Sequence, residues 1–427
     1  MRVASELERL STSLVTADDL QCLVDAARDR RFIAIGEASH GTHEFYEWRA
    51  ELTRRLIVEG GVGWIGVEGD WPDCWRIDRW VRGLADTPRD ARAVLSGFSR
   101  WPTWMWANTE VCDFLDWLRE HNRLLPSEQR TGFYGLDVYS LWDSLARVIG
   151  WLHAHSPSDV PTAMKAWECF APFNERPENY AWNTRLVPET CEADVVSLLA
   201  AVRRRMIPDG DEAFDALQNA TIAANAENYY RAMVRTDAGS WNIRDTHMAD
   251  TIDRLADHFG PASKGIVWAH NTHIGDARGT SMRAHGLVNL GQLVRERHGL
   301  QSTLLVGFAS HRGSVLAASR WGSPPLRMPV PEAADGSHED TLHRCLAGPA
   351  ILDFPSSRVS SWLSRTAGHR AIGVVYEPRA EAQNYVPTTM GMRYDALIWL
   401  EDTTPVTPIT HERTPAELEF ETEPSGY

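Results

Sequence analysis

The chain lacks any apolar run long enough to cross a membrane. Among its 427 residues, no stretch approaches the ~20 consecutive apolar residues of a transmembrane helix. Its first six residues, MRVASE, do not have the basic and then apolar character of a signal peptide. We therefore expect no membrane partner and a cytoplasmic location.

Cysteines are few, and none of them forms a Cys-x-x-Cys pair. The six are scattered along the chain, at Cys22, Cys74, Cys112, Cys169, Cys191 and Cys345. This spacing predicts isolated buried thiols in a reducing compartment, and it argues against disulfides and against a zinc knuckle.

Basic residues are fewer than acidic residues. The 43 lysines and arginines face 58 aspartates and glutamates, which gives a net charge of -15. Such a charge repels phosphate backbones, so we expect no nucleic-acid partner.

Several familiar catalytic motifs are missing. The chain has no Gly-x-Ser-x-Gly elbow, no His-Glu-x-x-His and no P-loop. Residues 61–66 match Gly-x-Gly-x-x-Gly, but they run into a predicted strand, whereas a dinucleotide-binding loop follows one. Because these motifs are absent or stand in the wrong context, we expect no cofactor.

Three short apolar runs each end in ionisable residues. Residues 32–35 lead to Glu37 and His40, residues 62–67 lead to Glu68, and residues 265–268 lead to His270 and His273. Runs of this kind are typical of buried strands, and ligands bind at the carboxyl ends of strands in open α/β sheets. The pattern predicts that these five side chains share one rim and perform acid/base or metal chemistry.

The order of elements predicts an α/β fold with a mixed central β-sheet flanked by helices. Strands and helices alternate at first, with helices near residues 42–59, 73–82 and 104–121 and a short strand at 132–134. Residues 139–260 are almost wholly helical and are predicted to form an insertion along one side of a deep active-site cleft. Strands resume at 265–268, 303–307, 314–318, 351–354, 371–376 and 396–400. We expect one domain over residues 1–410 and a poorly ordered acidic tail over 411–427.

Arg49 lies in the apolar stripe of its predicted helix, with Phe45, Leu52 and Leu56. A buried arginine needs a partner, and Glu37 and Glu68 are the nearest carboxylates at that sheet edge. Its guanidinium would hold them ionised and offer donors to an oxyanion. Alternatively, the side chain extends past the stripe to solvent.

The histidines allow more than one interpretation. His40 suits a general base at neutral pH, oriented by Glu37, but the two could equally be a solvated loop residue and a helix-start carboxylate. His270 and His273 are a structural pair or half of a metal site that Glu37, His40 and Glu68 would complete.

Tryptophan is abundant: 18 are present, and seven fall between Trp64 and Trp106. They form either a tryptophan-rich core or an aromatic wall for a bulky, partly apolar small molecule. On the second interpretation, Trp71 and Trp104 contact substrate. Asp137 and Arg244 are further candidates for substrate binding, with capping or a salt bridge as their alternatives.

The ordered motifs resemble the erythromycin esterases. The resemblance lies in GEASHGT (36–42) with Glu44 and Arg49, VEGDWPD (67–73), GLDVYS (135–140), SWNIRDTHM (240–248) and WAHNTHIGD (268–276). It implies that His40 is a general base and that Glu37, Glu68, Arg49, His270 and His273 complete the catalytic set. It further implies that water opens a macrolide lactone without a covalent acyl-enzyme.

Three alternatives stay open beside this hypothesis. The same residues could bind a metal in a metal-dependent hydrolase, or His40 could move a proton in a biosynthetic dehydratase or cyclase. The chain could also bind a ligand without chemistry, although an unused cluster of buried charges is costly.

Overall fold

The computed structural model describes residues 2–84, 88–173, 177–186, 190–205, 210–234, 239–354 and 360–409, so the predicted tail at 411–427 lies outside the described residues. The strands are β1 (Ser11–Ser13), β2 (Phe32–Ile35), β3 (Val62–Val67), β4 (Gly132–Gly135), β5 (Lys264–Trp268), β6 (Thr303–Ala317), β7 (Leu326–Val330), β8 (Ala350–Asp353), β9 (Thr366–Arg370), β10 (Tyr385–Thr389) and β11 (Ala396–Thr403). The helices of the first half are α1 (Arg2–Leu10), α2 (Gln21–Ala27), α3 (His43–Gly60), α4 (Trp71–Val81), α5 (Ala91–Leu95), α6 (Thr109–Arg123), α7 (Leu141–His155), α8 (Val160–Phe170), α9 (Pro177–Leu186) and α10 (Glu192–Arg205). Those of the second half are α11 (Asp211–Met233), α12 (Gly239–His258), α13 (Asn271–Ile274), α14 (Leu290–His298), α15 (His338–Cys345), α16 (Ser361–Ser364) and α17 (Met390–Arg393).

The central sheet is mixed, as predicted. Six strands pair in parallel in the order β11-β6-β2-β5-β3-β4. At one side, β8 pairs antiparallel with β11, and β1 pairs antiparallel with β8. Strand β7 returns antiparallel along the second half of β6, while β9 and β10 form a separate two-stranded sheet.

Alternation along β2 divides the core between the two faces of the sheet. Ile33 and Ile35 point into a cluster with residues of α3 and α6, whereas Phe32 and Ala34 point into a cluster with residues of α12 and α14. Both faces are therefore covered, which is why the parallel strands are apolar throughout.

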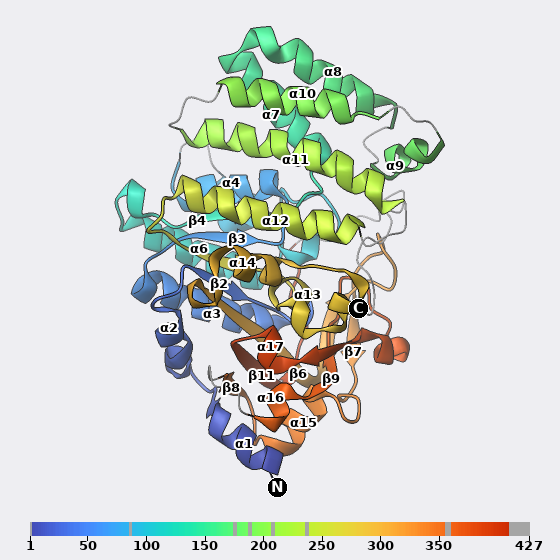
Figure 1. The fold of residues 1–427 in the computed structure, drawn as a ribbon. Helices are drawn as coiled ribbons and strands as arrows, with labels where there is room; N and C mark the ends of the chain where they lie inside the picture. Colours follow the sequence, from blue (N-terminus) through green and yellow to red (C-terminus); the bar gives the residue numbers. More distant parts are fainter. Residues whose placement is uncertain are drawn as a thin grey trace.

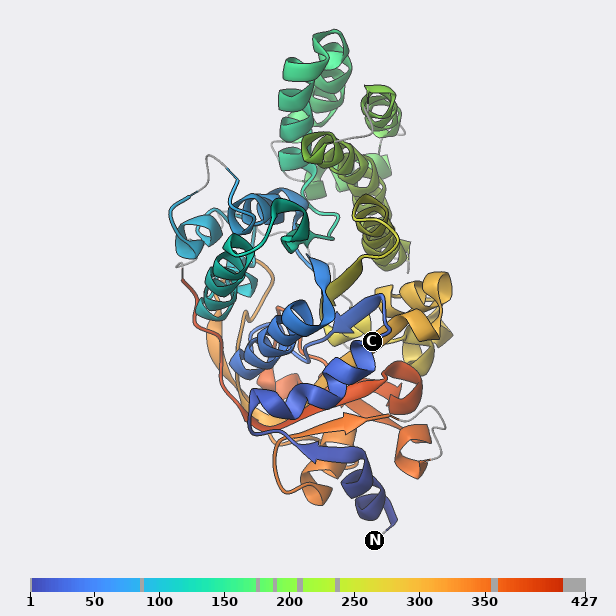
Figure 2. The ribbon, with the colours of Figure 1, turned by 90° about the vertical axis from the view of Figure 1, so that its left-hand side faces the viewer.

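A block of helices stands at one end of the molecule, opposite the N-terminus (Figures 1 and 2). Helices α7, α8, α10 and α11 share a hydrophobic cluster of their own. Helix α12 follows α11 and returns the chain to the sheet, where it packs against α14. Among the described residues, no helix combines the length and the apolar composition of a membrane span.

Two strand predictions in the C-terminal half were wrong. Segment 303–307 and all but the last residue of segment 314–318 belong to one continuous strand, β6, because β11 pairs along it through the polar stretch at Arg312. Residues 371–376 make only isolated bridges, from Ile372 to Ser39 and from Val375 to Ala318. Their apolar character reflects packing of Ile372 and Tyr376 against Val315 rather than strand pairing.

The prediction of isolated thiols was also wrong for one pair. Cys169 and Cys191, 22 residues apart, form a disulfide between the end of α8 and the start of α10. The helical block brings these two positions together, which their spacing in the sequence could not indicate. Cys22, Cys74, Cys112 and Cys345 are free. The disulfide removes the cysteine-based argument for a cytoplasmic location, because such bonds are rare there.

Candidate active site

Four neighbouring parallel strands deliver ionisable residues to one edge of the sheet. Glu37 follows β2, His270 follows β5, Glu68 follows β3 and Asp137 follows β4, and these strands lie side by side in that order. The predicted convergence of the distant segments therefore occurs at the carboxyl ends of the strands.

Glu37, His40 and Arg49 form the first part of the site. Nδ1 of His40 lies 2.8 Å from Oε1 of Glu37, and Nη1 of Arg49 lies 3.1 Å from Oε2 of the same carboxylate. All three residues are at most 1% exposed. Glu37 thus accepts from the imidazole on one oxygen and pairs with the guanidinium on the other, which fixes both partners.

Arg49 is buried in the apolar stripe of α3, which is the first of the two interpretations that the sequence allowed. Its guanidinium carbon lies 4.4 Å from the ring centre of Tyr46 and 4.8 Å from that of Trp268. The ion pair is with Glu37 and not with Glu68. Enclosed in this way, Arg49 holds Glu37 and does not reach the cavity described below.

His270 connects the first part to the second. Its ring centre lies 4.8 Å from that of His40, and its backbone N–H donates to Oε2 of Glu68 at 2.8 Å. Burial, and after it the electrostatic interaction with His40, holds the pKa of His270 well below its usual range. His270 is therefore a neutral imidazole packed beside His40.

Arg244, on α12, organises the second part. It donates through Nη2 to Glu68 at 2.7 Å and to Asp137 at 2.8 Å, and through Nε to Asp137 at 3.0 Å. Asp137 and Arg244 therefore form the salt bridge given above as their alternative role, and both also line the cavity. Burial alone would raise the pKa of Glu68, but His273 and Arg244 outweigh it and hold that pKa well below the usual range.

His273 lies between two carboxylates. Its Nδ1 is 3.0 Å from both oxygens of Asp245, and its Nε2 is 3.3 Å from Oε1 of Glu68. Burial would lower the pKa of His273, but Asp245 and Glu68 together raise it to about 10. His273 therefore holds its proton more firmly than an ordinary histidine does.

A cavity opens over Glu68, Asp137 and Arg244. It encloses about 520 Å³ of empty space, a figure that includes the solvent at its open mouth. Its other lining residues come mainly from the segment that follows β3 and from the stretch before α6: Gly69, Asp70, Asp73, Phe98, Arg100, Trp101, Pro102, Met105, Trp106, Tyr139, Trp321 and Val374. Only Tyr139 and Arg244 come from the predicted helical insertion, so the insertion contributes one part of the wall. Glu37, His40, His270 and His273 are not among the lining residues, although the backbone of His270 and the ring of His273 both contact Glu68.

Trp71 and Trp104 do not line this cavity. Trp71 stacks with Trp75 and with Tyr134 and donates to Asp215. Both Trp71 and Trp104 are fully buried. The tryptophan-rich segment thus divides between core and wall, and Trp101 and Trp106 supply the wall. The sequence could not separate the two groups, because neighbouring positions in a loop face different directions.

The cavity also contains charged residues that the sequence analysis did not single out. Asp70 pairs with Arg100 at 2.6 Å. Burial, followed by the charge of Asp70, raises the pKa of Asp73 to about 7. Asp70 and Asp73 lie two and five residues after Glu68 in the motif at 67–73. Asp245, which pairs with His273 and does not line the cavity, directly follows Arg244. Asp70, Asp73 and Asp245 could have been identified from the sequence, because each lies close to a candidate residue in the chain.

The geometry at His273 is unfavourable for a metal ion. A guanidinium nitrogen of Arg244 lies 3.2 Å from Nε2 of His273, so a cation there would meet a fixed positive charge. Within the described ranges, the group of metal-ligating side chains with ligand atoms within 4.8 Å of one another is elsewhere, at His311, His343 and Glu401.

Comparison with protein families matches residues 57–403 to the model described as erythromycin esterase. Two curated relatives are each 22% identical to this chain. One is YbfO of Bacillus subtilis (strain 168), whose name assigns it provisionally to the hydrolases, aligned over 93% of this chain and 89% of its own. The other is an erythromycin esterase type II of Escherichia coli, aligned over 77% of this chain and 81% of its own.

Two solved structures share the fold. A succinoglycan biosynthesis protein superposes with a TM-score of 0.77 at 18% identity, over 95% of this chain and 97% of its own. A histidine-to-asparagine mutant of the erythromycin esterase EreC, in its open conformation, superposes with a TM-score of 0.64 at 15% identity, over 96% and 98%.

Proposed function

Because this chain is a hydrolase of the erythromycin esterase family, we propose that it opens a lactone or another carboxylic ester by direct attack of water. The observation that carries the proposal is the buried Glu37–His40 pair, held by Arg49. His40 lies beside His270, whose backbone N–H donates to the cavity carboxylate Glu68. An imidazole oriented by a carboxylate is the usual arrangement of a general base.

In the proposed mechanism, His40 removes a proton from a water molecule. Glu37 accepts from Nδ1 at 2.8 Å, so Nε2 is the nitrogen that acts as base. Glu37 then stabilises the imidazolium that forms, and the ion pair with Arg49 fixes the position of Glu37. Glu68, which lines the cavity, positions the water between the cavity and His40. Proton transfer of this kind contributes roughly 10²–10⁴-fold to the rate.

The cations near Glu68 stabilise the tetrahedral oxyanion. Arg244 lines the cavity, and its position is fixed by Asp137 and Glu68. His273 stands behind it as an imidazolium. Arg244 therefore takes the role that the sequence analysis gave to Arg49, because Arg49 is enclosed behind Glu37. A preorganised donor of this type is worth roughly 10²–10³ in kcat.

The proposed substrate is a bulky, partly apolar small molecule such as a macrolide. Trp101, Trp106 and Trp321 offer aromatic surface in the cavity, while Arg100 and Arg244 offer a few fixed polar contacts. Large apolar walls with few polar groups suit such a ligand.

The test is the mass of the product formed from erythromycin and from simple lactones and aryl esters. Hydrolysis adds one water to the substrate, whereas a dehydratase removes one, a cyclase leaves the mass unchanged, and a binding protein returns the substrate intact. Turnover after exhaustive treatment with a chelator is measured in parallel, and activity lost with a bound metal would support the metal-dependent alternative. His40→Gln should abolish turnover while the far-UV circular dichroism spectrum stays unchanged.

A further inference from the structure

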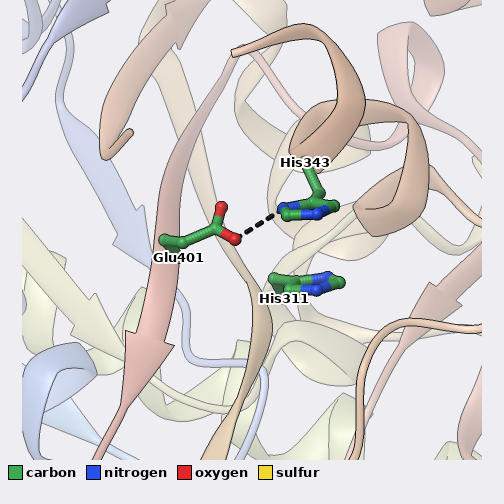
Figure 3. Close-up of side chains that lie close together, drawn as sticks. All are labelled: His311, His343 and Glu401. Carbon is green, nitrogen blue, oxygen red and sulfur yellow. Dashed lines mark ion pairs between the residues drawn. The ribbon is translucent and has the colours of Figure 1, made fainter. Parts of the chain in front are cut away.

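A second cluster of ionisable side chains lies outside the cavity, where three elements meet. His311 is on β6, Glu401 is on β11, and His343 is on α15 (Figure 3). Strands β6 and β11 are paired in parallel on either side of these positions, with Leu400 opposite Ser310 and Asp402 opposite Arg312. His311 and Glu401 are therefore neighbours across the sheet, and α15 packs against β6 to bring His343 to them.

The three side chains present a ligand set for a metal ion. One nitrogen of each histidine and one oxygen of Glu401 all lie within 4.8 Å of one another. The two imidazole rings are stacked in parallel with their centres 3.7 Å apart, and Nδ1 of His343 lies 2.5 Å from Oε1 of Glu401 (Figure 3). Two imidazoles and a carboxylate are a common donor set for zinc.

The surroundings of His311 give a second reason, independent of the geometry of the cluster, to expect a ligand here. It is 4% exposed, and both of its ring nitrogens are buried without a hydrogen-bond partner. Buried polar groups are normally paired, so an imidazole left in this state needs an explanation. A metal ion would satisfy it by accepting a lone pair from one of the ring nitrogens.

The charges around the cluster favour a cation. Arg312, the nearest arginine in the sequence, pairs with Asp402 at 2.9 Å and with Glu332 at 3.0 Å. Its positive charge is thus matched by two carboxylates, and Glu401 remains as excess negative charge beside the two imidazoles.

We propose that His311, His343 and Glu401 bind one zinc ion, with water completing a tetrahedral set. Zinc–nitrogen bonds of about 2.0–2.1 Å require the two imidazoles to tilt out of their parallel stack. His343 and Glu401 are partly exposed and have room to turn. The ion would join α15 to the β6–β11 pair, so its role is to stabilise this part of the fold rather than to act on the substrate.

The experiment is a zinc titration of the full chain, without a histidine tag, after removal of metals by a chelator and dialysis. Isothermal titration calorimetry and elemental analysis measure affinity and stoichiometry, and thermal unfolding with and without zinc measures the stabilisation. We expect one zinc per chain and a higher unfolding temperature with zinc. His343→Ala and Glu401→Gln should each weaken binding at least tenfold and remove the thermal shift.

The matched control is His298→Ala, which removes a histidine paired with Asp253 at 2.8 Å on another surface. It should bind zinc as the unmodified chain does. The proposal is overturned if the unmodified chain binds no zinc above background. It is equally overturned if His343→Ala and Glu401→Gln bind zinc as tightly as the control, which would place the ion elsewhere.

Discussion

The ion pair of Arg49 with Glu37 should be strongly coupled in the stability of the protein. Both side chains are fully buried and 3.1 Å apart, so removing either partner leaves the other charge unpaired in the interior. Breaking such a pair costs ~3–5 kcal/mol. Arg49→Met should lower the free energy of unfolding by about that amount, because the charge of Glu37 loses its partner.

The double mutant separates this ion pair from simple packing. Arg49→Met combined with Glu37→Gln removes both charges, so its cost should fall below the sum of the single costs by ~2 kcal/mol or more. Urea unfolding measures each value. The control pair, Arg54 and Glu51, lies on the helix that carries Arg49. Its charged atoms are 3.0 Å apart but partly exposed, so its cycle should give less than ~1 kcal/mol. Additive costs for Arg49 and Glu37 would refute the reasoning.

Three further outcomes are expected. Arg244→Met should reduce kcat by ~10²–10³-fold with a smaller change in KM, whereas Arg147→Met, which removes an arginine outside the cavity, should leave both unchanged. The pKa of His273 is raised to about 10. Its protonation therefore stabilises the fold fully below pH ~6.5, and this stabilisation falls by ~1.4 kcal/mol per pH unit up to about pH 10. The difference in unfolding free energy between the unmodified chain and His273→Gln should shrink over that range, and a constant difference would contradict the assignment. Cys169→Ser should destabilise the protein by ~3 kcal/mol for its loop of 22 residues, as urea unfolding would reveal, and an unchanged midpoint would show that the bond contributes nothing.

Local relationships in the sequence predicted much of the site. Glu37 and His40 are three residues apart in one turn, so their contact needed only the correct placement of a strand end. The apolar stripe of α3 placed Arg49 towards the sheet, because side chains four residues apart share a helix face. The strand ends after β2, β3 and β5 then met through parallel pairing, which follows from the general topology of α/β sheets.

Pairings across long separations could not be predicted. Glu68 is paired by Arg244, 176 residues away, and the sequence offered Arg49 as an equally plausible partner. His273 becomes a cation only because Asp245 and Glu68 arrive from two other elements. Such partners depend on how α12 packs on the sheet, and a periodic pattern shows which face is buried but not which residue it meets.

The central claim is that water activated by His40 attacks the ester directly, and turnover in ¹⁸O-labelled water tests it most directly. With a substrate that the unmodified enzyme hydrolyses, the account predicts one ¹⁸O in the product carboxylate, no covalent adduct in the intact mass of the enzyme during turnover, and no labelled product from folded His40→Gln. Labelled product formed by His40→Gln at a rate close to that of the unmodified enzyme would contradict the account, and so would an acyl adduct that forms and decays at the turnover rate.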